Sequence, residues 1–175
     1  MPPSSTPWRN GRPLSRCARD EYSHPLMSLV TASIRIAAPP ATVWKTVMDP
    51  SRLGDWVTIH RDLRHADDGP LRVGYEMSQR VHLRGVSLDV HWRLIECQSE
   101  KRAVWEGKGP ARSHARTEYT LEALEDGCTR FDYANDFRPP LGPIGALASR
   151  ALVGGMPERE AIRTLERLRA LLQSA

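Results

Sequence analysis

Over much of this chain, apolar and polar residues alternate with the period of a β-strand. The alternating segments cover about 28–37, 72–83, 86–96, 102–108, 113–124 and 129–138, and a more polar extended segment covers about 58–65. Such alternation is typical of antiparallel strands that bury one face and expose the other. Gly85 and the pair Asp126-Gly127 favour tight turns between consecutive segments. The pattern therefore predicts an antiparallel sheet of about seven strands.

A helical period replaces the alternation directly after the first strand. Pro39 and Pro40 suit the start of a helix, where a missing N–H costs no hydrogen bond. The apolar residues spaced for one buried face are Val43, Trp44, Val47 and Met48. Asp49-Pro50 ends this helix, because a residue before proline avoids the α region. A short second helix then leads to Trp56.

The last third of the chain, from Pro143 to Leu172, is predicted to be helical. Its expected apolar face consists of Ile162, Leu165, Leu168 and Leu172. Glu160 and Arg163 lie on the opposite, charged face, where the i, i+3 spacing favours an ion pair. Gly154-Gly155 followed by Pro157 predicts a kink or a break in the helix.

Composition places one domain at 28–173, preceded by a basic tail at 1–27. The tail is rich in Pro, Ser and Arg and lacks periodicity, so we expect it to be disordered. Met27 directly precedes the first strand, and a natural start there would leave residues 1–26 outside the native protein. A genuine flexible tail is the alternative.

Bulk properties narrow the class of protein further. The net charge of +4 is a poor argument for nucleic acid, because solvated arginines commonly explain mild basicity. No apolar run is long enough to span a bilayer. The three cysteines form no Cys-x-x-Cys pair and no secretory signal is present, which together favour the cytoplasm.

The order of elements is that of the helix-grip fold, an α+β fold. The chain resembles the START-like (SRPBCC) superfamily and, within it, the polyketide cyclase/dehydrase and lipid-transport family, over residues 28 to about 172. The residues that carry the resemblance are Ala38-Pro39, Val43-Trp44, Asp49-Pro50 and Trp56. It implies a curved antiparallel sheet wrapped around the long C-terminal helix, with a cavity between them. Small residues at 145–151 would leave room for a guest, and close packing without a void is the alternative.

A closer likeness is to a subgroup of actinobacterial members of this family. It rests on Trp56-Val57-Thr58-Ile59-His60 and on the segment 140–145. Some relatives in that subgroup are named as toxin components of toxin–antitoxin pairs. The interruption at Gly154-Gly155-Met156-Pro157 departs from the unbroken last helix of the family, which affects the expected shape of the cavity mouth.

Candidate ligand-binding residues lie on the inward faces of the predicted strands and helix. They are Tyr75, Met77, Gln79, Trp92, Trp105, Tyr119, Tyr133, Asn135 and Ser149. Aromatic rings suit a pocket for a flat or greasy ligand, although a protein core needs the same residues. Gln79 and Asn135 are the polar groups expected to orient a guest, with an ordinary buried amide as the alternative.

Catalytic residues are harder to assign, and His60 and Tyr119 are the candidates. An imidazole titrates near neutrality and suits general acid–base work, and a surface histidine is the alternative. A strand would place His60 and Asp62 on one face, as in half of a two-histidine, one-carboxylate iron site. A third ligand is missing, so no metal and no other cofactor is expected.

Three functions follow, in order of preference. The first is binding of a hydrophobic small molecule, such as a lipid or a polyketide-like or aromatic compound, in the cavity. The second is a cyclase or dehydratase that acts on a related substrate held in one folded shape. The third is a toxin with a small antitoxin protein as its partner. A homodimer is a further possible assembly.

Overall fold

The computed structural model describes residues 28–83, 85–138 and 156–173. The predicted tail at 1–27, the candidate Ser149 and the small-residue segment 145–151 lie outside these residues.

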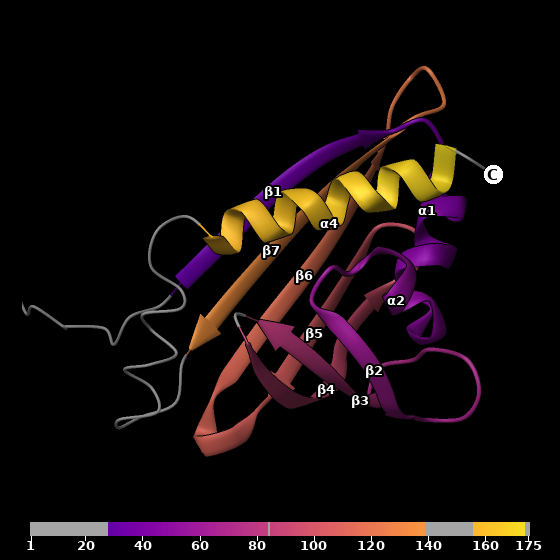
Figure 1. The fold of residues 1–175 in the computed structure, drawn as a ribbon. Helices are drawn as coiled ribbons and strands as arrows, with labels where there is room; N and C mark the ends of the chain where they lie inside the picture. Colours follow the sequence, from indigo (N-terminus) through magenta and orange to yellow (C-terminus); the bar gives the residue numbers. More distant parts are fainter. Residues whose placement is uncertain (1–27, 84, 139–155, 174–175) are drawn as a thin grey trace, which may run out of the picture.

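The described chain forms one antiparallel sheet of seven strands in the order β1-β7-β6-β5-β4-β3-β2 (Figure 1). The strands are β1 (Ser28–Ile36), β2 (His60–Ala66), β3 (Glu76–Leu83), β4 (Val86–Gln98), β5 (Arg102–Lys108), β6 (His114–Ala123) and β7 (Thr129–Arg138). Strands β2 to β7 follow one another as a meander, and β1 closes the far edge by pairing with β7. The α+β helix-grip class predicted from the alternating pattern is confirmed.

Short helices fill the excursion between β1 and β2. They are α1 (Pro40–Val47), the 3₁₀ turn η1 (Pro50–Arg52) and α2 (Leu53–Trp56). Pro40 is the first residue of α1, and Asp49 caps η1 by accepting a hydrogen bond from the Ser51 amide at 2.9 Å. A second 3₁₀ turn, η2 (Pro110–Arg112), joins β5 to β6. The bounds of α1, η1 and α2 match closely the two short helices predicted from the positions of the prolines.

The C-terminal helix α4 (Met156–Gln173) runs across one face of the sheet, alongside β1 and in contact with α2 (Figure 1). Leu165 and Leu168 are buried against the sheet, and Ala161 is buried on the same face. Ile162 was predicted to belong to this face, but its side chain is 50% exposed. The face instead contains residues 161, 165 and 168, because spacings of four and three follow the helical period from Ala161. None of the described helices is long and apolar enough to cross a bilayer.

A buried hydroxyl ties the start of β7 to the loop that enters α1. Thr129 is fully buried, and its Oγ1 donates to the carbonyl oxygen of Ala38 at 2.7 Å. The bond satisfies the carbonyl just before Pro39, the N-cap residue of α1. It therefore fixes the excursion of α1 and α2 relative to the sheet.

Glycines with positive φ set the ends of several strands. Gly85 and Gly127 have φ of 81° and 78°, as the two predicted hairpins require. The alternating pattern also placed Val73 in the strand that became β3, but Val73 is 61% exposed. Gly74, at a φ of 91°, turns the chain just before Tyr75, so β3 begins only at Glu76.

Candidate functional site

A pocket of about 200 Å³ lies between the concave face of the sheet and α4. Its floor comes from strands β1 and β3 to β7, one end from α2, and its cover from Ala161 and neighbouring residues of α4. The candidates that line it are Met77, Gln79, Trp92, Trp105, Tyr119, Tyr133 and Asn135. The structure thus brings together side chains from five strands that are far apart in sequence. Their role in ligand binding stays a prediction.

Tyr75 does not line the pocket, although the alternating pattern grouped it with Met77 and Gln79. Its ring is buried beside Trp105 in an edge-on contact, with ring centroids 6.4 Å apart. Burial and the nearby carboxylates of Asp67 and Asp68 raise the pKa of its hydroxyl. In this position the ring supports a pocket wall rather than facing a guest.

Aromatic side chains form most of the apolar wall. Trp56 meets Tyr119 edge-on at 6.1 Å, and Tyr119 stacks on Tyr133 at the same centroid distance. Across the sheet, the Trp92 indole lies over Gly107, the residue opposite it on β5. Only a residue without a Cβ lets the ring lie so close to the backbone. The result is a wall of broad, rigid surfaces suited to a flat or apolar guest.

Two of the pocket tyrosines are strongly perturbed. Burial raises the pKa of Tyr133 to about 12, and side-chain hydrogen bonds with Asn135 and Thr117 oppose that rise only in part. Burial also raises the pKa of Tyr119, with a contribution from Tyr133. Both phenols are therefore neutral at physiological pH. They can donate or accept hydrogen bonds but cannot serve there as bases.

A hydrogen-bonded pair lies at the β2–β3 side of the pocket. His60 Nδ1 is 2.9 Å from Oε1 of Gln79, and Gln79 lines the pocket while only 7% of its surface is exposed. His60 itself does not line the pocket. The imidazole thus contacts a pocket side chain without lining the pocket itself, and its catalytic role stays a prediction.

The predicted shared face for His60 and Asp62 is wrong. A β-bulge between them pairs His60 with Val81 but Asp62 with Arg80, which turns Asp62 to the opposite face of the sheet. Asp62 is exposed there and forms an ion pair with Arg64 at 2.8 Å. Across the described ranges, no three His, Cys, Asp or Glu side chains are close enough together to hold a metal ion.

A polar rim on α4 was missed by the sequence analysis. Glu160 and Thr164 both line the pocket, and both contact Thr58, which precedes β2. The Thr58 hydroxyl is 3.1 Å from Glu160 Oε2 and 2.8 Å from Thr164 Oγ1. The predicted ion pair of Glu160 with Arg163 is confirmed at 3.0 Å. The four-residue spacing of Glu160 and Thr164 beside Ala161 is the signal that could have placed them at the edge of the buried face.

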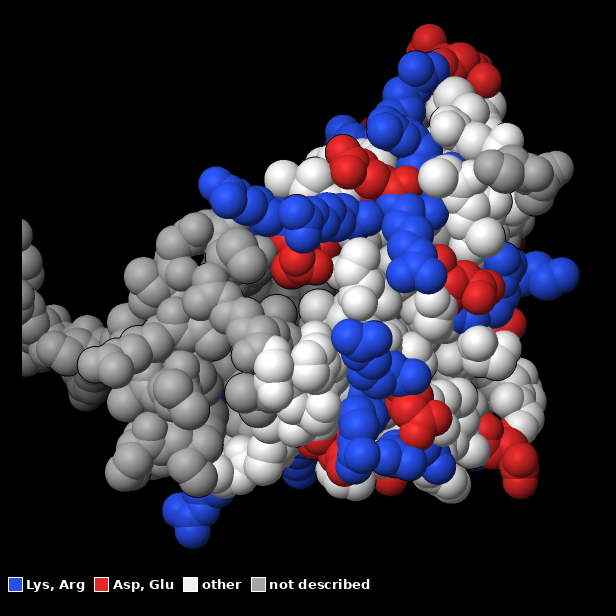
Figure 2. Space-filling view, viewed as in Figure 1, with Lys and Arg blue, Asp and Glu red and all other residues white. Residues whose placement is uncertain are grey.

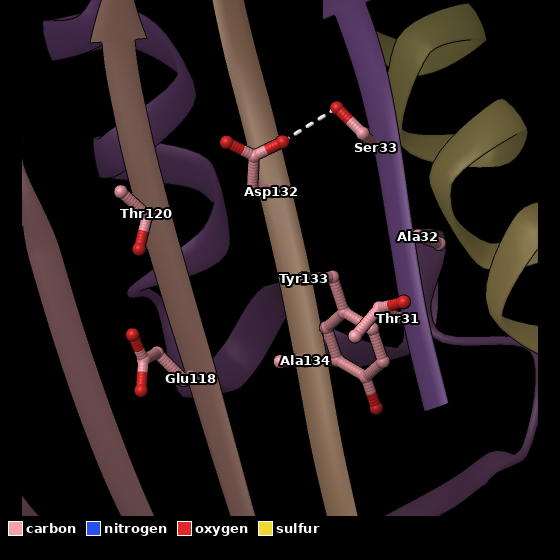
Figure 3. A pocket seen from close by; sticks show the side chains of 8 residues that line it. All are labelled: Thr31, Ala32, Ser33, Glu118, Thr120, Asp132, Tyr133 and Ala134. Atoms are coloured by element: carbon pink, nitrogen blue, oxygen red, sulfur yellow. Dashed lines mark hydrogen bonds between the residues drawn. The ribbon is translucent and has the colours of Figure 1, made fainter. Parts of the chain in front are cut away.

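A second depression, of about 310 Å³, lies on the outer face of the sheet (Figure 3). Short polar or acidic side chains of β1, β6 and β7 line it, including Thr31, Glu118 and Thr120. Ser33 donates to Asp132 across it at 2.5 Å. Two of its polar side chains already pair with each other, and its apolar lining is limited to Ala32, Tyr133 and Ala134. The pocket beneath α4 is therefore the better candidate site.

The surface above the pocket carries both signs of charge. Figure 2 shows Lys and Arg along the exposed side of α4 and over the β2 edge, interspersed with Asp and Glu. Arg163 pairs with Glu160 on α4, and Arg64 pairs with Asp62 on β2. This mixture does not create the single-sign field that steers a highly charged partner.

Comparisons with known proteins agree with the fold. The architecture is that of a helix-grip protein, and the chain belongs to the family described as polyketide cyclase/dehydrase and lipid transport, whose sequence profile matches residues 27–173. Among solved structures, the Zhui aromatase/cyclase from Streptomyces sp. R1128 superposes with a TM-score of 0.70 at 16% identity, covering 85% of this chain and 94% of that one.

Two further relatives show the breadth of the similarity. A protein from Thermus thermophilus superposes with a TM-score of 0.68 at 18% identity, covering 84% of this chain and 98% of that one. The protein named Toxin Rv0910 from Mycobacterium tuberculosis H37Rv is 24% identical over 127 residues, covering 72% of this chain and 88% of the relative. At these identities the two solved structures show a common fold.

Proposed function

We propose that the protein binds a hydrophobic small molecule, such as a lipid or a polyketide-like or aromatic compound, in the pocket beneath α4. The observation that carries the proposal is a pocket of about 200 Å³ walled by aromatic and aliphatic side chains of six strands and two helices. A concave apolar site with few polar groups is the usual form of a small-molecule site. Family membership supports the same function.

The size and chemistry of the pocket limit the guest. The volume of about 200 Å³ suits a compact molecule better than a long, double-chain lipid. Trp92, Trp105 and Tyr133 offer broad ring faces, and Gln79 and Asn135 offer amides on opposite parts of the sheet. A flat, mostly apolar molecule with a few polar atoms fits this arrangement best.

Native mass spectrometry of protein purified from its own host tests the proposal. A retained small molecule, identified after denaturation, would support binding and reveal the ligand class. A bare mass, together with no binding of the fluorescent probe 1-anilinonaphthalene-8-sulfonate to the purified protein, would contradict it. The compartment we infer for this activity is the cytoplasm.

Matched substitutions on α4 show whether the pocket is the place of binding. Ala161→Phe projects a ring from the buried face into the pocket, whereas Ile162→Phe adds a ring on the neighbouring, half-exposed position. We expect Ala161→Phe to abolish probe binding and Ile162→Phe to leave it near the wild-type value. Equal binding by both variants would locate the ligand elsewhere.

A cyclase or dehydratase activity is the second candidate. The superposition with an aromatase/cyclase favours it, and the neutral hydroxyl of Tyr119 in the pocket provides a hydrogen-bond donor for a substrate carbonyl. Glu160, on the pocket rim, is a carboxylate that the sequence analysis did not consider. Turnover of a poly-β-ketone model substrate that is lost in Tyr119→Phe would favour this candidate over simple binding.

A toxin role is the third candidate, and the name of the Mycobacterium tuberculosis relative is what favours it. This role requires a small protein partner. Expression of the chain alone should then arrest growth of the host, and co-expression of the partner should restore it. Normal growth with the chain alone would exclude the role in that host.

A further inference from the structure

Gln79 is an isolated amide in an apolar part of the pocket. Its neighbours across the sheet are Leu63 on β2 and Val90 on β4, and Met77 and Val81 flank it on the same face of β3. With 7% of its surface exposed, the side chain is more than nine-tenths buried. A buried amide needs hydrogen-bond partners, because an unpaired one costs roughly 1–3 kcal/mol.

His60 satisfies one end of this amide and determines which end faces the pocket. An amide oxygen only accepts hydrogen bonds, so His60 Nδ1 carries the proton in the 2.9 Å contact with Oε1. The two N–H groups of Gln79 then remain for the pocket. The imidazole lies beside the backbone of Gly54, where a side chain would come within 3.6 Å of His60 Cδ2.

We propose that the His60–Gln79 pair is a specificity-determining device that selects ligands with a hydrogen-bond acceptor, such as a carbonyl oxygen, on an otherwise apolar body. The inference rests on the proposed function of the pocket. A pure hydrocarbon would displace water from Gln79 and leave its N–H groups unpaired, whereas a ketone would pair with them. His60 acts through Gln79 and is a positioning residue.

Two matched probes test this preference. 1-Tetralone and tetralin differ by one carbonyl oxygen, and both displace 1-anilinonaphthalene-8-sulfonate if they bind in the pocket. We expect the wild-type protein to bind tetralone about three- to tenfold more tightly relative to tetralin than their partition between water and octanol predicts. Gln79→Met, which keeps the length of the side chain and removes its donors, should abolish this excess.

Further variants separate positioning from contact. His60→Phe should reduce the excess preference without abolishing probe binding, because Gln79 is then free to rotate. Gln79→Glu keeps an acceptor for His60 but presents a second acceptor to the ligand, so tetralone should lose its advantage. Asn135→Leu removes the other pocket amide and shows whether that amide, instead of Gln79, gives the preference. Ser78→Ala, on the exposed outward face of β3, is the control that should keep the wild-type preference. Circular dichroism and thermal unfolding establish that each variant is folded.

The possible failures are distinct. If neither probe displaces the dye from the wild type, the pocket does not bind such molecules, and the proposed function fails together with this inference. If both probes bind without excess preference, or if Gln79→Met retains the preference, only the donor role of Gln79 is overturned. If Asn135→Leu loses the preference instead, the acceptor is recognised on β7.

Discussion

Replacing Gly107 with alanine is the most direct test of how the pocket wall is built. A Cβ at this position would lie 2.7, 2.8 and 3.0 Å from Cζ3, Cε3 and Cη2 of Trp92. Ordinary van der Waals contact begins near 3.4 Å, so the indole must retreat by the difference from 2.7 Å, about 0.7 Å. All three atoms belong to one rigid ring, and the ring therefore has to move as a unit. The space into which the ring can move is the pocket, which Trp92 lines.

The size of the effect follows from this geometry. Overpacking of a well-packed site costs typically about 1–3 kcal/mol, and the pocket gives the ring space, which favours the lower half of that range. We expect Gly107→Ala to lower the free energy of unfolding by about 1–2 kcal/mol, measured by urea denaturation with an unchanged slope. Binding of 1-anilinonaphthalene-8-sulfonate should fall as well, because the displaced ring occupies the pocket.

The background variant Trp92→Leu provides the control. Leucine lacks the ring, so in this background Gly107→Ala should be neutral or stabilise the strand, as alanine does relative to glycine elsewhere. The two substitutions should therefore couple by roughly 1–3 kcal/mol in a double-mutant cycle. Equal destabilisation by Gly107→Ala in both backgrounds would refute the explanation based on the indole contact.

Three other properties can be measured directly. In the folded state the pKa of Tyr133 is about 12, whereas in the unfolded chain it is near 10.0. The unfolded chain therefore loses this proton first, and the free energy of unfolding should fall as the pH rises between these two values. Absorbance of the phenolate should show Tyr119 and Tyr133 ionising only as the protein unfolds. Ionisation of both phenols near pH 10 in the folded protein would contradict their burial. Thr129→Val keeps the shape of the side chain but leaves the Ala38 carbonyl unpaired, and chemical denaturation should show a loss of about 1–3 kcal/mol. Leu168→Ala should cost about 2–5 kcal/mol and Ile162→Ala less than about 1 kcal/mol, and similar costs would contradict the assigned buried face of α4.

Local signals predicted the fold because they act over a few residues. The proline pair at 39–40 opens α1, and Gly127 supplies the hairpin between β6 and β7. The alternating pattern gave the inward face of most strands correctly, including Gln79 on β3 and Asn135 on β7. Where it failed, at Val73, a backbone turn at Gly74 interrupted the strand without changing the apparent period.

The candidate site could be predicted only in part, for a different reason. Which residues face inward follows from the period of each strand, and this was enough to identify Trp92, Trp105 and Tyr133. Which of them meet depends on strand order and on where α4 crosses the sheet. The sequence contains no local signal for the bulge that separates His60 from Asp62, and none that brings Thr58 to Glu160.

The sequence by itself therefore determined the elements of this protein, their order and the apolar face of each, because periodicity and turn residues act locally. The tertiary structure decided that Gln79 is held by His60, that Tyr75 supports the wall instead of lining it, and that Glu160 reaches the pocket rim. These facts depend on distances between side chains from separate strands and helices. Such distances are set by register, twist and helix docking, which no single segment specifies.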